Sequence, residues 1–119
     1  MTTVTLNIHP PEECSPNWRG HWAVKSRASR AAREAVKLSA HQADGGPYHK
    51  AHIHYHVICA AERPRDIDNW LARCKPMTDG LRDAGIIGAD DHKHLSLSMT
   101  FEVNKNRAPS TVITVTEMN

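Results

Sequence analysis

Hydrophobic and polar residues alternate along four stretches of the chain, and a period of two is typical of half-buried β-strands. The stretches are 2–8 (TTVTLNI), 49–60 (HKAHIHYHVICA), 94–103 (HLSLSMTFEV) and 110–117 (STVITVTE). In the second stretch, the apolar positions 51, 53, 55 and 57 alternate with His52, His54 and His56. Successive side chains of a strand point to opposite faces, so we expect the three imidazoles on the face opposite to the apolar residues.

Two further stretches carry a helical pattern. From about Ser26 to Gln42 helix formers predominate, and Ala32, Val36 and Ala40 recur at helical spacing. Ser26 is the expected cap of this helix, and the sequence Gly-Gly-Pro at 45–47 ends it. A second helix is predicted from about 69 to 84, with Gly85 after its last turn. Pro76 lies inside that range and predicts either a kink or a fresh helix start.

In chain order these elements read β-α-β-α-β-β, which predicts an α+β fold with a small mixed sheet and helices packed on it. The 119 residues suit a single domain, 1–119, with its own core. The longest apolar run, at 57–61, is too short to cross a membrane, and the first residues lack the order of a signal peptide. Three cysteines without a CxxC pair favour a reducing compartment. We therefore expect a cytoplasmic protein that does not associate with membranes.

The placement of charge is more informative than the net charge of +2. Basic residues gather in one segment, against the single acid Glu34: Arg19, Lys25, Arg27, Arg30, Arg33 and Lys37. Such a segment is either a solvated helix surface or a surface that contacts phosphate groups.

Acidic residues gather in RPRDIDNWLARCK (63–75) and GADDHK (88–93). If the backbone is extended at Asp66 and Asp68, both carboxylates point the same way and can reach one Mg²⁺ ion. The Asp90-Asp91 pair can fold back to supply a third carboxylate. A metal held in this way beside arginines suits phosphodiester hydrolysis, and Lys75 offers a cation for a reacting oxygen. The alternative is that these aspartates bind backbone N–H groups in turns, with Asn69 as a plain helix cap.

The three histidines of the second strand allow a different interpretation. Imidazoles at alternating positions of one strand face can bind zinc. They can equally form the polar side of a half-buried strand.

Several of these segments together resemble the RusA-like family of crossover-junction endonucleases, phage and prophage enzymes that resolve four-way (Holliday) junctions in DNA recombination and repair. The segments are RDIDN, Lys75, DGLRDAGII and DDHKH, with PNWRGHWAVKSRASR as the basic segment. The similarity extends from about residue 5 to residue 117. Lys75 lies further after Asp68 than in the best-known members, and Pro76 makes room for the extra residues at a helix start.

The resemblance implies a role for each matching residue. Asp66, Asp68 and Asp91 match the metal-binding aspartates, with Asp90 as the alternative third ligand, and Lys75 matches the catalytic lysine. It also implies Mg²⁺ as the cofactor, with Mn²⁺ as a possible substitute, branched DNA as the substrate, and a homodimer. Residues expected to contact DNA are Asn17, Arg19, Lys25, Arg27, Arg30, Arg33, Arg63 and Arg65.

The function predicted from the sequence is therefore a metal-dependent nuclease that hydrolyses phosphodiester bonds in paired cuts. Two alternatives stay open. One is a non-catalytic DNA-binding protein on the same fold, and the other is a small zinc-binding protein that uses His52, His54 and His56.

Overall fold

Four strands form one mixed sheet in the order β1-β4-β2-β3, in a computed structural model that describes residues 1–119. They are β1 (Thr2–Leu6), β2 (Ala51–Cys59), β3 (Leu95–Val103) and β4 (Ser110–Glu117). β4 runs antiparallel to both β1 and β2, whereas β2 and β3 are parallel. The predicted α+β class with a small mixed sheet is confirmed.

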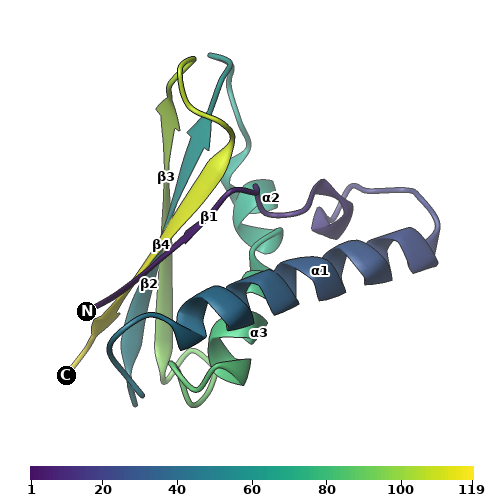
Figure 1. Ribbon diagram of the computed structural model, residues 1–119. Helices are drawn as coiled ribbons and strands as arrows, with labels where there is room; N and C mark the ends of the chain where they lie inside the picture. Colours follow the sequence, from purple (N-terminus) through teal and green to yellow (C-terminus); the bar gives the residue numbers. More distant parts are fainter.

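The helices α1 (Trp22–His41), α2 (Ile67–Ala72) and α3 (Lys75–Asp83) lie on one face of this sheet (Figure 1). A short 3₁₀ helix, η1 (Glu12–Cys14), precedes them. The helix predicted over 69–84 is two helices, because a new helix, α3, begins at Lys75. Pro76 lies in its first turn, where a backbone N–H would have no partner within the helix, so proline is tolerated there. No helix combines the length and the apolar composition that a membrane span requires.

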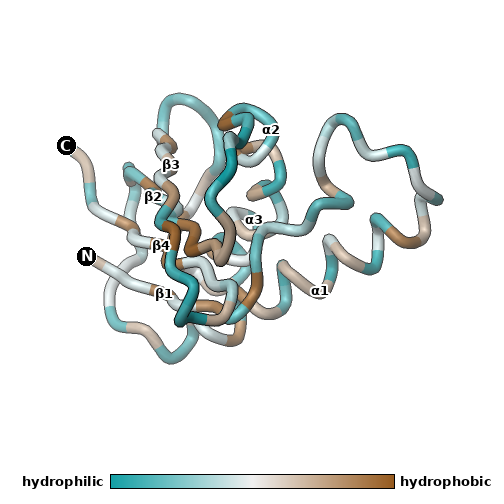
Figure 2. The backbone as a smooth tube through the Cα atoms, turned by 90° about the horizontal axis from the view of Figure 1, so that it is seen from above, coloured by the Kyte–Doolittle hydropathy of each residue, from teal (hydrophilic) through white to brown (hydrophobic).

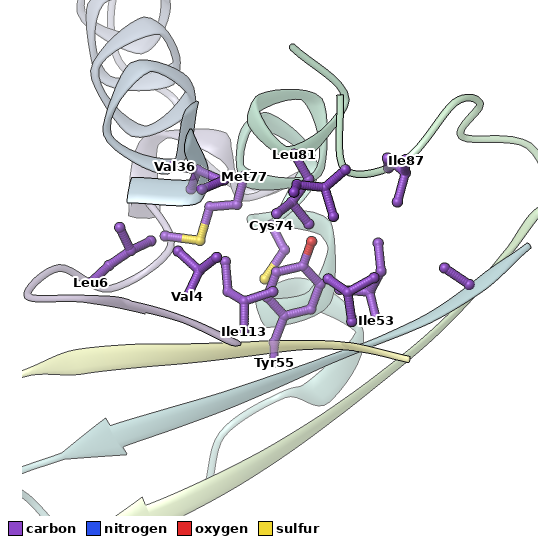
Figure 3. Packing of buried hydrophobic residues seen from close by; sticks show 14 of the residues in the cluster. Val4, Leu6, Val36, Ile53, Tyr55, Cys74, Met77, Leu81, Ile87 and Ile113 are labelled. Carbon is purple, nitrogen blue, oxygen red and sulfur yellow. The ribbon is translucent and has the colours of Figure 1, made fainter. Parts of the chain in front are cut away.

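The hydrophobic core fills the space between the sheet and the helices (Figure 3). Val4, Ile53 and Ile113 point from the strands toward Val36 and Met77 on the helices, and all five side chains are almost completely buried. Burial of this apolar surface is the main favourable term in folding. The alternation in β2 predicted this orientation correctly.

A buried phenol also lies in this core. Tyr55 is completely buried, and its hydroxyl forms a hydrogen bond with the hydroxyl of Thr78 on α3. This bond satisfies a polar group that would otherwise be costly to bury. It also ties α3 to the centre of the sheet.

Helix α1 begins four residues before the predicted Ser26 cap, at Trp22. His21 is the cap, and its Nδ1 accepts a hydrogen bond from the Ala23 N–H at 3.0 Å. The buried residues of α1 are Ala32, Val36 and Ala40, all in its second half. The first half projects away from the body of the molecule (Figure 2), so no apolar periodicity marked where the helix starts.

Helices α1 and α3 pack closely because α3 has a glycine at the contact. A Cβ atom on Gly80 would lie 2.5 Å from the Arg33 carbonyl oxygen and 2.8 Å from the Val36 Cβ. Both distances are far below van der Waals contact, so any side chain at this position would push the helices apart. The close packing fixes α3, and Lys75 at its start, against α1.

The face of the sheet away from the helices carries a continuous run of polar contacts, which we call the histidine ladder. Each of His52, His54 and His56 on β2 uses both ring nitrogens to contact successive side chains of β3. The Nδ1 and Nε2 distances are 2.6 and 2.7 Å for His52 (Ser96, Ser98), 2.6 and 2.8 Å for His54 (Ser98, Thr100), and 2.7 and 3.0 Å for His56 (Thr100, Glu102). The parallel register of β2 and β3 places these residues side by side.

Candidate active site

A cavity of about 470 Å³ opens between α2, the start of α3, the 84–94 loop and β3. We call it the acidic cavity. Its walls include Asp68, Lys75, Asp90 and Asp91, which come from three separate segments of the chain. The remaining lining residues are Leu71, Ala72, Thr78, His92, Leu95 and Leu97. The structure thus brings together four of the residues that the sequence singled out for chemistry.

Asp66 and Asp68 lie at the beginning of α2 but have different surroundings. Asp66 is the cap of the helix, and its Oδ1 accepts hydrogen bonds from the N–H groups of Asp68 and Asn69 at 3.1 and 3.4 Å. Its Oδ2 accepts a further bond from the Asn69 side chain at 3.2 Å. Asp68 lies in the first helical turn, is exposed, and receives no hydrogen bond at its carboxylate.

This geometry corrects two expectations. The backbone is extended at Asp66 but helical from Ile67 onward, so the two carboxylates do not point the same way as neighbours on a strand would. Asn69 is not the cap, because Asp66 takes that position. Asp66 is also absent from the walls of the acidic cavity.

Lys75 links α3 to the loop that follows it. Its Nζ donates to Asp90 Oδ2 at 2.6 Å and to Asp79 Oδ1, one helical turn away, at 3.0 Å. These hydrogen bonds, first the one to Asp90, raise the pKa of the Lys75 ammonium above its ordinary value. The same lysine lowers the pKa of Asp90, to which Arg82 adds a weaker attraction at 3.8 Å. Lys75 is therefore a cation, and Asp90 an anion, at neutral pH.

Asp91 is held by its own loop. Its carboxylate accepts hydrogen bonds from the Lys93 N–H at 2.9 Å and from His94 Nδ1 at 2.6 Å. The bond from His94 is the main cause that lowers the pKa of Asp91. Asp90 and Asp91 both line the cavity, so the geometry leaves either able to serve as the third carboxylate.

The acidic cavity offers oxygen ligands for a hard cation. Carboxylates are the ligands that Mg²⁺ and Mn²⁺ prefer, and Asp68, Asp90 and Asp91 supply them on the wall of one cavity. No three or more His, Cys, Asp or Glu side chains are gathered closely enough to enclose an ion. The donor type therefore fits the metal that the sequence predicts, while the carboxylates would have to move closer together around it.

Most of the basic residues predicted to contact DNA are exposed. Lys25, Arg27 and Arg30 lie on the projecting half of α1, and Asn17 and Arg19 lie in the loop before it. Arg33 is different, because its guanidinium binds Asp83 of α3 through two hydrogen bonds of 2.5 and 2.8 Å. Arg33 thus has a role in joining the two helices.

Arg63 and Arg65 lie in the loop before α2, beside a second cavity. Arg65 donates to the Arg63 and Ala61 carbonyl oxygens at 3.0 and 2.9 Å, which fixes it in the loop. The side chain of Arg63 is exposed and takes part in no hydrogen bond or ion pair. Arg63 is therefore free to bind a phosphate, whereas Arg65 supports the loop.

Two residues of the site were missed in the sequence. Asp79 follows Lys75 by one helical turn, a spacing that marks a potential ion pair and could have been recognised. Arg82 reaches Asp90 across the turn after α3, and no local pattern indicates that contact.

Comparison with known proteins gives a relative for the whole chain. No protein-family model matches the sequence. An uncharacterized protein of Xylella fastidiosa is 33% identical over 121 residues, which cover 98% of this chain and 76% of the relative. This chain therefore belongs to the same protein family as that Xylella fastidiosa protein.

Proposed function

We propose that this protein is a Mg²⁺-dependent, structure-selective endonuclease of the RusA-like type, which resolves four-way DNA junctions by hydrolysing phosphodiester bonds. One observation carries the proposal: Asp68, Lys75 and the Asp90-Asp91 pair line a single cavity although they come from three segments of the chain. Carboxylates that can bind a hard cation, next to a lysine, are what hydrolysis of a phosphodiester requires.

Asp68, Asp90 and Asp91 would hold the cation, whereas Asp66 caps α2 outside the walls of the cavity. Mg²⁺, when bound, supplies Lewis acidity toward a phosphate oxygen and lowers the pKa of water. Asp68 is the most available ligand, because no protein group donates a hydrogen bond to its carboxylate.

Lys75 would stabilise negative charge as it develops on the reacting phosphate. Its raised pKa keeps it protonated at neutral pH, so it acts as a hydrogen-bond donor and not as a base. Asp79 orients the ammonium from within the same helix. A substrate phosphate competes with Asp90 for this ammonium, so the Lys75–Asp90 pair has to loosen when DNA binds.

The exposed basic residues of α1 would follow a duplex arm. Lys25, Arg27 and Arg30 contact phosphates in this proposal, and such contacts set affinity and register without reading sequence. A second candidate is a DNA-binding protein without catalysis. It would use the exposed basic residues of α1, and the acidic cavity would then have no catalytic part.

A synthetic four-way junction, labelled on each strand in turn, tests the proposal. We expect paired cuts in opposed strands with Mg²⁺, no cuts with EDTA, and no cuts in a linear duplex of the same sequence. Tight junction binding without cleavage in either Mg²⁺ or Mn²⁺ would favour the non-catalytic alternative. Equal affinity for the junction and the linear duplex would contradict both structure selectivity and the junction as substrate.

A further inference from the structure

The second cavity, of about 380 Å³, lies between the loop before α2, the first residue of α2 and the end of β3. We call it the arginine cavity. Its lining residues are Glu62, Arg63, Arg65, Ile67, Phe101 and Val103. Arginines at the rim and apolar side chains in the walls give it a different character from the acidic cavity.

The apolar walls are open to solvent in the free protein. Ile67 is 50% exposed and Val103 is 37% exposed, although both are large hydrophobic side chains. Phe101 is half-buried, and its ring packs edge-on against Trp70 with 5.3 Å between ring centroids. These walls would lose contact with water if a flat apolar group entered.

Two arginines give the cavity a polar rim that suits a nucleotide. The Arg65 guanidinium carbon lies 5.8 Å from the centroid of the Phe101 ring, so one wall is a preformed cation–π pair. Arg65 is fixed by two backbone carbonyl groups, whereas Arg63 is unpaired and exposed. Arg63 can therefore bind a phosphate, whereas Glu62, which also lines the cavity, would repel one.

The arginine cavity lies close to the candidate active site along the chain and along the sheet. Ile67 precedes Asp68 directly, and α2 separates the two cavities. Leu97 lines the acidic cavity and Phe101 lines the arginine cavity, four residues further along the same face of β3. That spacing is roughly 13 Å along a strand, which is within reach of a few nucleotides of one DNA strand.

We infer that the arginine cavity receives a nucleobase that has left its stack in the DNA, near the phosphate held at the acidic cavity. This inference rests on the proposed nuclease function. Aromatic and apolar walls with arginine are the means by which proteins hold unstacked bases. A base is easiest to unstack where pairing is already interrupted, as at the branch point of a junction. The cavity would thereby help the protein to prefer branched over linear DNA.

The test uses junctions that carry the fluorescent base 2-aminopurine at single positions around the branch point and, as a reference, in the middle of an arm. The protein carries Asp68→Asn, so that the DNA stays intact during the measurement. We expect binding to raise the fluorescence severalfold at one or two positions near the branch point and to leave the arm position unchanged. The double substitution Ile67→Ala and Val103→Ala should remove most of this rise and weaken junction binding about tenfold. Leu38→Ala, which truncates another exposed hydrophobic residue far along α1, is the matched control and should alter neither.

The outcomes separate this inference from the function on which it rests. If the junction is bound in preference to a linear duplex but no position brightens, the inference is wrong while the proposed function stands. A rise that persists in the double variant also overturns the inference. If the protein shows no preference for the junction, the proposed function fails, and the inference fails with it.

Discussion

Lys75 belongs both to the candidate site and to the fold, because it lines the acidic cavity and is the first residue of α3. It donates to one carboxylate within that helix and to another in the loop that follows. Both partners are acidic, so Lys75 keeps two negative charges close to the cavity without a metal. A divalent cation would take over this neutralising role and free the ammonium for a phosphate.

At the scale of single residues, the clearest prediction concerns Asp68. Asp68→Asn removes the charge while barely changing the shape of an exposed side chain, so the fold should persist. Cleavage of the four-way junction should fall to background, because the amide is a poor ligand for Mg²⁺. Junction binding, measured by gel shift in EDTA, should stay the same or become tighter, since a negative charge near DNA is lost.

The matched control is Asp44→Asn, the same chemical change at an exposed carboxylate outside both cavities. It should cleave as fast as the unmodified protein. Cleavage by Asp68→Asn at a rate close to that of the control would show that Asp68 is not a metal ligand.

A second residue-scale prediction concerns His54 and pH. Burial, and then the neighbouring His56 and His52, lower the pKa of His54 below its ordinary value. As the pH falls through about 6.5, the unfolded chain therefore binds this proton before the folded protein does. The free energy of unfolding should decrease in that window, and the loss is complete once the pH is below the lowered pKa.

Urea unfolding at pH 7.5 and pH 5.5 measures this effect. His54→Gln keeps a hydrogen-bond donor and acceptor but does not titrate, so the difference between the two pH values should shrink. The same substitution at the exposed His41 is the control. An equal difference in His54→Gln and in the control would contradict the role given to His54.

At the scale of elements, α1 has two halves with different tasks. Its second half is buried against the sheet and α3, whereas its first half lies against η1 only and carries Lys25, Arg27 and Arg30 on its exposed side. A helix that extends beyond the core keeps its basic side chains accessible from several directions. This arrangement favours contact with a large polyanion over a purely structural use of the segment.

We predict that Arg27→Ala and Arg30→Ala each weaken junction binding without favouring any sequence. Each lost phosphate contact should reduce the slope of log affinity against log salt concentration by about 0.9. Fluorescence anisotropy across a salt series measures the slope. Arg33→Ala is a less informative variant, because Arg33 binds Asp83 and its loss would loosen the packing of α1 on α3.

Glu34→Gln provides a control of opposite sign on the same surface, since Glu34 lies beside Arg27 and Arg30. Removing this acid should strengthen binding. A salt dependence that is identical in all three variants would exclude this half of α1 as the surface that contacts DNA.

Patterns within a single element predicted the fold class, the four strands and the inward face of β2, because strand periodicity reflects burial directly. The start of α1 was predicted too late, since its buried residues all lie in its second half and the first half shows no periodic pattern. The order of strands was beyond sequence reasoning as well. β4 lies between β1 and β2, a result of long-range pairing that no local signal reports.

The candidate site also has features that the sequence predicted and features that it did not. The motif around Asp66 and Asp68 marked the right part of the chain, and the cavity gathers Asp68, Lys75 and the acidic pair. The use of Asp66 as a cap depends on where α2 begins, which the spacing of two aspartates does not determine. The bond between Arg33 and Asp83 joins residues 50 apart in sequence, so only the packed structure reveals it.

At the scale of the whole molecule, the size of one chain limits the length of duplex DNA that it can contact. Its principal dimensions are 35 × 33 × 25 Å, which correspond to about 7 to 10 base pairs of duplex at 3.4 Å per pair. One chain therefore spans about one turn of a single arm. It has one acidic cavity, and resolution of a junction takes two cuts.

We predict that the protein acts as a two-fold homodimer. A four-way junction has two-fold symmetry, and two copies related by the same axis would place two acidic cavities on opposed strands. Sedimentation at micromolar concentration should give about twice the chain mass of 13.3 kDa. Mixing the protein with an excess of Asp68→Asn should convert paired cuts into single nicks, because mixed dimers keep one intact site. A monomer that still makes paired cuts would contradict this prediction.

The hydrogen bonds of the histidine ladder all run in one direction, which is fixed by the last acceptor, Glu102. A carboxylate only accepts hydrogen bonds, so His56 has to donate from Nε2 to Glu102. A neutral imidazole donates once, which obliges His56 Nδ1 to accept from Thr100, and Thr100 to accept in turn from His54. The same reasoning passes through Ser98 and His52 to Ser96.

One tautomer is thereby selected at all three rings, and each hydroxyl is oriented by the next. The opposite direction would require each ring to carry its hydrogen on the other nitrogen and His56 Nε2 to accept from Glu102, whose carboxylate has no hydrogen to donate. The open face of the sheet is thereby held in one sequence of hydrogen bonds, whose direction is set at Glu102.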